Sequence, residues 1–164
     1  MRLLSAFLFL CAAAWSQSIP ENLKPPANER LILETHALGD QVYVCQPAGG
    51  GFGWILAGPD AKLYDYLGKQ VATHYAGPTW EGTDGSKVKA KVAQTFAADS
   101  QSIPWLRLQA VDHSGDGVMS AISTIQRLHT QGGKAPATGC SAASQGQKAR
   151  VPYTADYHFY APAL

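Results

Sequence analysis

The chain has 164 residues, of which 13 are basic, 12 acidic and 46% hydrophobic, a composition that indicates one globular domain. Its formal net charge of +1 excludes the broad basic surface on which sequence-independent nucleic-acid binding depends. We therefore expect no nucleic-acid partner. No apolar stretch reaches the roughly 20 residues of a membrane-spanning helix, so we also expect no membrane span in the mature protein.

The first 16 residues have the pattern of a secretory signal peptide. A positive start at Arg2 precedes an apolar run over 3–14, and the small residues Ala14 and Ser16 mark a cleavage site. We therefore predict a signal peptide at 1–16 and a secreted product, extracellular or periplasmic. The alternative is a lipoprotein signal around Cys11, although Leu10 stands where a small residue is usual.

The cysteine count predicts one disulfide. Cleavage after Ser16 removes Cys11 and leaves Cys45 and Cys140, and two thiols in an oxidising compartment pair. Two free buried thiols are the alternative. Cleavage also removes Arg2, so the mature chain carries equal numbers of basic and acidic side chains.

After cleavage, the segment 17–30 holds three prolines without periodicity, which predicts an extended N-terminal arm before a β domain over 31–164. Alternating apolar and polar residues then recur between turn residues. The predicted strands are 41–45, 54–57, 61–66, 69–75, 87–92, 103–111 and 151–160, with a glycine-rich loop at 49–53 and a stop at 58–60.

Two strands have a clear inward face. Val88, Ala90 and Val92 alternate with lysines, and Val151, Tyr153, Ala155, Tyr157 and Phe159 follow a strict period of two. The segment 117–130 fits a short helix or turn that runs into a strand. Seven or eight short strands predict a mostly β, single-domain fold, either an antiparallel β-sandwich or a small barrel, with one disulfide.

Several short motifs in order resemble a known family. They are Tyr43-Val44-Cys45, Pro59-Asp60-Ala61-Lys62-Leu63, His74-Tyr75-Ala76-Gly77-Pro78-Thr79-Trp80-Glu81, Ile103-Pro104-Trp105-Leu106, Ile125-Gln126-Arg127-Leu128 and Val151-Pro152-Tyr153-Thr154-Ala155-Asp156-Tyr157. The chain resembles the secreted bacterial and fungal family known as domain of unknown function 3455. The resemblance implies secretion and a single domain, but it implies no activity and no residue roles.

The segment 74–86 holds the densest group of polar and aromatic residues. His74, Trp80, Glu81 and Asp84 lie there among glycines and prolines, and loops on a rigid sheet often carry binding residues. Trp80 could stack on a sugar ring while the two carboxylates accept hydrogen bonds from hydroxyls. Arg127 is a candidate clamp for a carboxylate or, alternatively, the structural partner of an acid.

A second segment resembles the first half of a calcium loop. Asp112, Ser114 and Asp116 place oxygens at positions one, three and five, and Gly117 stands at position six. Ser123 occupies the twelfth position, where a bidentate Glu is usual. An Asp- and Gly-rich turn between strands is the structural alternative.

These observations favour a secreted binding or surface-associated module, with an extracellular polysaccharide or cell-wall polymer as the first ligand to consider and no cofactor. One alternative is a small secreted hydrolase that uses His74, Glu81 and Asp84 as its acid and base groups. Another is a structural or host-interaction protein without a small-molecule site. The chain carries no G-x-S-x-G, H-E-x-x-H or complete G-x-G-x-x-G motif, so the sequence identifies no catalytic residue.

Overall fold

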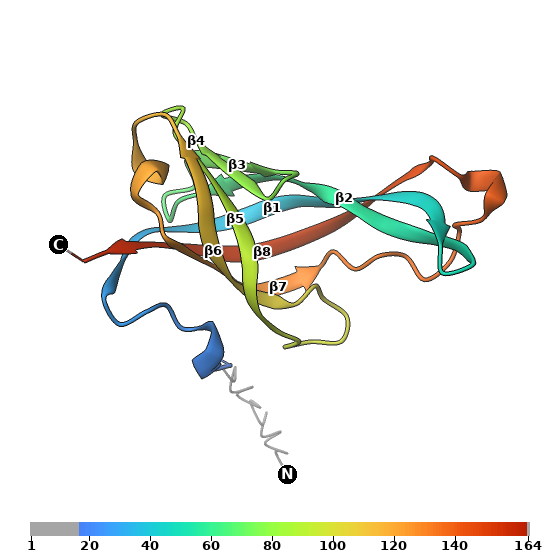
Figure 1. The fold of residues 1–164 in the computed structure, drawn as a ribbon, viewed down its shortest axis with the longest axis horizontal. Helices are drawn as coiled ribbons and strands as arrows, with labels where there is room; N and C mark the ends of the chain where they lie inside the picture. Colours follow the sequence, from blue (N-terminus) through green and yellow to red (C-terminus); the bar gives the residue numbers. More distant parts are fainter. Residues whose placement is uncertain (1–16, 164) are drawn as a thin grey trace, which may run out of the picture.

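The computed structural model describes residues 17–163. In this part of the chain, eight antiparallel strands form one closed barrel in which each strand pairs with the next and β8 pairs with β1 (Figure 1). The strands are β1 Glu29–Ala48, β2 Gly51–Tyr64, β3 Gln70–Tyr75, β4 Thr79–Gly82, β5 Lys87–Phe96, β6 Trp105–Ser114, β7 Thr124–Gly132 and β8 Lys148–Pro162. The mostly β fold is confirmed, and of the two predicted architectures the structure has the barrel.

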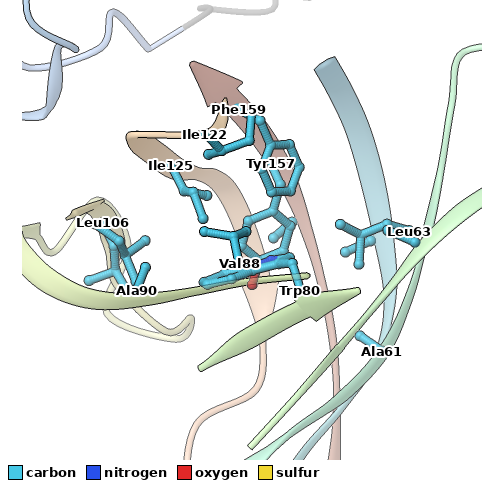
Figure 2. Packing of buried hydrophobic residues seen from close by; sticks show 14 of the residues in the cluster. Ala61, Leu63, Trp80, Val88, Ala90, Leu106, Ile122, Ile125, Tyr157 and Phe159 are labelled. Carbon is cyan, nitrogen blue, oxygen red and sulfur yellow. The ribbon is translucent and has the colours of Figure 1, made fainter. Parts of the chain in front are cut away.

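Alternation along the strands builds the core inside the barrel. Tyr153, Ala155, Tyr157 and Phe159 of β8 are all buried, as their period of two predicts. Figure 2 shows Tyr157 and Phe159 packing with side chains from several other strands around Trp80. Because adjacent paired strands present the same face to the interior, the eight inward stripes together form one hydrophobic core.

The predicted strand 87–92 is confirmed as the first part of β5, which continues to Phe96, but one of its three predicted inward residues is exposed. Val88 and Ala90 of β5 are buried, whereas Val92 is 53% exposed. The pairing of β5 with β6 shifts register between Lys89 and Ala90 and again between Val92 and Gln94. Such bulges bend a strand, and Val92 lies where the barrel interior opens to solvent.

The predicted loop at 49–53 is correct only for Gly49 and Gly50, and the predicted stop at 58–60 was wrong. β2 is continuous from Gly51 to Tyr64, and only Gly49 and Gly50 form the turn after β1. Both turn glycines have positive φ, +57° and +80°, which suits a tight hairpin turn. At Gly58 and Pro59 the strand does not stop, because both residues pair with β1, and the register shift between Val42 and Tyr43 leaves only the neighbouring Ala57 unpaired.

The disulfide between Cys45 and Cys140 is present and joins β1 to the segment before β8. In Figure 1 the β1–β2 hairpin and this segment extend together beyond the rest of the barrel. Between β7 and β8 lies the 3-10 turn η3 Ala142–Ser144, and β6 and β7 are joined through the 3-10 turn η2 Val118–Ala121. The predicted turn-then-strand over 117–130 is therefore confirmed.

The N-terminal arm packs on the outside of the barrel. β1 begins at Glu29, two residues before the predicted start of the β domain, and the arm contains the 3-10 turn η1 Glu21–Leu23. Leu23 is fully buried against Trp105 and Leu128, and its carbonyl accepts a 2.6 Å hydrogen bond from Gln126 Nε2. The predicted signal peptide lies outside the described residues.

Candidate functional site

One end of the barrel interior holds a cavity of about 370 Å³. The rest of the interior is filled by the core in Figure 2. The lining is mostly apolar and includes Leu56, Pro59, Val92, Ile103, Leu106 and Leu108. Six lining residues carry polar groups, namely Gln41, Tyr43, His74, Trp80, Arg127 and Tyr157.

Strand register places these polar side chains in the interior. His74 of β3 pairs with Trp80 of β4, and Arg127 of β7 pairs with Leu106 on one side and Tyr157 on the other. Directly paired residues of antiparallel strands project to the same face. Arg127 therefore faces inward between a core leucine and a core tyrosine.

His74 is held as a neutral ring against Trp80. The two rings stack with centroids 4.0 Å apart and an interplanar angle of 7°. The Nδ1 atom lies 2.9 Å from the carbonyl oxygen of Thr79, and because a carbonyl only accepts, Nδ1 carries the proton. Burial lowers the pKa of His74 to about 3, so Nε2 keeps a free lone pair at neutral pH.

Arg127 brings a positive charge to the cavity wall. Its Nε and Nη2 atoms donate to the carbonyl oxygen of Pro104 at 3.2 and 2.9 Å, and no carboxylate among residues 17–163 lies within ion-pair distance. Burial raises the pKa of Tyr43 and of Tyr157, and the charge of Arg127 opposes both shifts. The guanidinium thus lies among the polar lining groups without an acidic partner there.

Two further donors of the lining are unsatisfied. Gln41 Nε2 and Trp80 Nε1 are buried without a hydrogen-bond acceptor in the described part of the chain. Tyr43, in contrast, donates from its hydroxyl to the Gly133 carbonyl at 2.6 Å. Buried donors without acceptors are costly and uncommon. Both atoms are closed to solvent, so they lie behind the cavity surface, and other atoms of Gln41 and Trp80 contribute to the lining.

Glu81 and Asp84 lie apart from the cavity. Glu81 accepts a 2.8 Å hydrogen bond from the Tyr75 hydroxyl and pairs with Lys87 at 3.2 Å on the outer face. These two contacts lower the pKa of Glu81. The structure therefore brings His74, Trp80 and Arg127 together and leaves Glu81 outside.

Asp84 has a structural role at the turn. Its carboxylate accepts from the Ser86 hydroxyl at 2.6 Å and from the Val118 amide at 2.8 Å. These hydrogen bonds, that from Ser86 first, lower the pKa of Asp84. The hydrogen bond from Val118 links the β4–β5 turn to η2.

The calcium candidates gain no geometric support. Asp112 and Ser114 belong to the end of β6, and Asp112 faces Lys89 at 3.7 Å. Asp116 follows in an exposed turn. Within residues 17–163, no three His, Cys, Asp or Glu side chains are grouped so that they could hold a metal ion.

Gln41, Tyr43 and Tyr157 line the cavity but were not among the candidates. Tyr157 was assigned to the core, which is also correct, because it is fully buried. Gln41 stands two residues before Tyr43 on the same inward face, and a glutamine on an apolar inward stripe is the one signal that could have indicated it.

By its fold and its cavity, the protein belongs to the class of small, disulfide-linked antiparallel barrels with a ligand-sized interior space. Within that class, the family model for a protein of unknown function, DUF3455, matches residues 25–161. The chain belongs to this family, as the sequence motifs indicated. No curated protein and no solved structure matches it significantly. None of the described residues forms a helix long and apolar enough to cross a membrane.

Proposed function

We propose that this protein is an exported binding module that holds a small, mostly apolar molecule inside its barrel. The observation that supports this proposal is the cavity of about 370 Å³ with an apolar lining and a few polar groups. Ligand pockets in proteins have this composition and span about 300–1,000 Å³. Small closed barrels commonly hold one small ligand in this position.

The proposed location outside the cytoplasm has two supports. The pattern of the first 16 residues is that of a signal peptide. The Cys45–Cys140 disulfide is compatible with an oxidising compartment. The module would therefore meet its ligand outside the cell or in a periplasm.

The geometry favours a small molecule over a polysaccharide. Trp80 is only 1% exposed, and its ring already stacks on His74. A polymer chain binds to an accessible aromatic face, which this indole does not offer. The binding module expected from the sequence is therefore retained, with a different class of ligand.

The geometry also disfavours the hydrolase. His74 pairs with Trp80 inside the barrel, whereas Glu81 pairs with Thr73 on the outer face. An effective general base has a pKa near the working pH, and the pKa of His74 is about 3. The three residues proposed from sequence do not form a common catalytic site.

A neutral apolar fluorescent probe, N-phenyl-1-naphthylamine, tests the proposal. We expect saturable one-to-one binding to the purified, disulfide-bonded protein. Val92→Trp should weaken binding because Val92 lines the cavity at its open end. Val111→Trp is the matched control, since Val111 is similarly exposed, 56% against 53%, but lies outside the lining.

Either of two results would refute the proposed function. The first is the absence of saturable probe binding by the folded protein. The second is equal affinity in Val92→Trp and Val111→Trp, which would place the probe elsewhere on the surface.

A further inference from the structure

We infer that the cavity selects apolar molecules that carry a single carboxylate, such as a medium-chain fatty acid. This inference rests on the proposed function and names the ligand class of the same cavity. It depends on the charge of the lining, on its free hydrogen-bonding groups and on its size.

The lining carries one formal charge. Arg127 is the charged member of the fourteen lining residues, and none of them is acidic. His74 is neutral at physiological pH because its pKa is about 3. The guanidinium is partly buried in a mostly apolar lining without an acidic partner, so a ligand that brings one negative charge would neutralise the cavity. A dianion such as a phosphate monoester would leave one charge uncompensated.

The free groups of Arg127 itself are all donors. Two of the five guanidinium N–H groups point to the Pro104 carbonyl, and the Tyr157 hydroxyl is a further hydrogen-bond neighbour of Arg127, which leaves two for a ligand. A carboxylate supplies two oxygens that accept several hydrogen bonds, and it pairs with Arg more strongly than a neutral group does.

The size and walls of the cavity limit the rest of the ligand. Its volume of about 370 Å³ corresponds to roughly a dozen water molecules at the density of the liquid. Leu56 and Val92 line the cavity, and each remains 53% exposed, so the apolar lining continues to the surface. A chain or ring system of about ten to twenty non-hydrogen atoms suits this space.

Displacement of N-phenyl-1-naphthylamine by decanoate, decan-1-ol and decylamine tests the inference at neutral pH. These three molecules share one chain and differ in the charge of the head group. We expect decanoate to bind at least about tenfold more tightly than decan-1-ol, because a hydrogen bond to a charged group contributes about 1.5–3 kcal/mol. Decylamine should bind most weakly.

Single-residue variants test whether Arg127 is responsible for the preference for decanoate over decan-1-ol. Arg127→Leu should reduce the decanoate-to-decanol ratio to near one, and Arg127→Lys should retain part of it. Arg107→Leu removes the same charge from the neighbouring strand β6 outside the cavity lining and should leave the ratio unchanged.

The outcomes separate this inference from the proposed function. If the wild-type protein binds the probe but binds decan-1-ol as tightly as decanoate, the barrel is a binding module and the carboxylate inference is wrong. A ratio that survives in Arg127→Leu would likewise overturn the role of Arg127. The wild-type comparison decides the ligand class even if Arg127→Leu does not fold, and failure of the probe itself to bind would refute the proposed function.

Discussion

Side-chain direction along β3 and β4 determines which candidate residues can act together. His74 and Trp80 are opposite each other inside the barrel, and Thr73 and Glu81 are opposite each other outside. The sequence indicated these chemical groups but not their directions, because the glycines and prolines of 74–86 are typical of a loop. The four-residue strand β4, Thr79–Gly82, is too short to show its alternation in the sequence.

The buried imidazole of His74 should make the protein less stable in acid. Its pKa is about 3 in the folded state and about 6.5 in the unfolded chain. The unfolded state therefore binds more protons between these values, so the free energy of unfolding decreases as the pH falls through this window. From pH 7 to pH 4 this group alone should cost about 3 kcal/mol.

Urea unfolding at several pH values would measure this loss. His74→Phe retains an aromatic ring beside Trp80 but cannot bind a proton, so its stability should depend less on pH between 7 and 4. Equal pH dependence in the wild type and His74→Phe would show that the ring does not remain neutral in the fold.

Asp84 should stabilise the fold only when it is ionised. Hydrogen bonds from Ser86 and Val118 hold its pKa below the usual value. A lowered folded-state pKa gives stability that is present above the unfolded pKa, about 3.9, and is lost as the pH falls through the folded pKa. Asp84→Ala should therefore lower the melting temperature at pH 7, and the difference from the wild type should shrink below about pH 4.

Asp116→Ala is the control for Asp84, because Asp116 is an exposed acid in the turn just before η2 and has no hydrogen bond from another described residue. Its melting temperature should stay close to that of the wild type at both pH values. A similar loss in both variants would mean that net charge, rather than the hydrogen bonds of Asp84, is responsible.

Among the elements, β2 is the one whose extent the local sequence pattern predicts least well. Gly58 and Pro59 are typical of a strand end, yet both pair with β1 within one continuous strand, next to a bulge at Ala57. Gly58 has a φ of +146°, and an added Cβ would lie 2.6 Å from Ala76 Cβ and 2.8 Å from Ala76 Cα. The close packing of β2 on the β3–β4 turn therefore requires glycine here.

Gly58→Ala should lower the free energy of unfolding by about 1–3 kcal/mol, because both the backbone conformation and the contact with Ala76 become strained. Gly53→Ala in the same strand is the control, since its Cβ would meet Ala48 Cβ at an ordinary 3.5 Å. Denaturant unfolding of the two variants checks the difference. Equal effects would show that the strand adjusts around residue 58.

The disulfide connects elements that are far apart in the chain. Cys45 and Cys140 are 95 residues apart in sequence, and a cross-link of this span is worth about 4–5 kcal/mol in the chain-entropy model. Cys45→Ala/Cys140→Ala should lose about this much unfolding free energy in denaturant titrations. The protein cleaved after Ser16 should show no reactive thiol when it is unfolded without reductant, and two reactive thiols would contradict the predicted pairing.

At the scale of the whole molecule, the closing pair of strands decides between the two predicted architectures. Alternating strands occur in sandwiches and barrels alike, so the local pattern predicts the β class without distinguishing them. Closure depends on the pairing of β1 with β8, for example Ala37 opposite Ala155, and no local signal marks a contact between such distant residues. The cavity could not be predicted for the same reason, because its walls come from strands that meet only in the closed barrel.

Closure should also be the last step of folding. The pairs from β1–β2 to β7–β8 join consecutive strands, whereas β1–β8 pairing joins the two ends of the sheet. Closing a long loop costs more entropy than forming a short hairpin, and folds rich in distant contacts fold in about milliseconds to seconds. Pulsed hydrogen exchange during refolding should therefore protect the β1 amides that bond to β2 before those that bond to β8. Because the two sets alternate along one strand, each controls for the other, and simultaneous protection of both would show that the barrel forms in a single step.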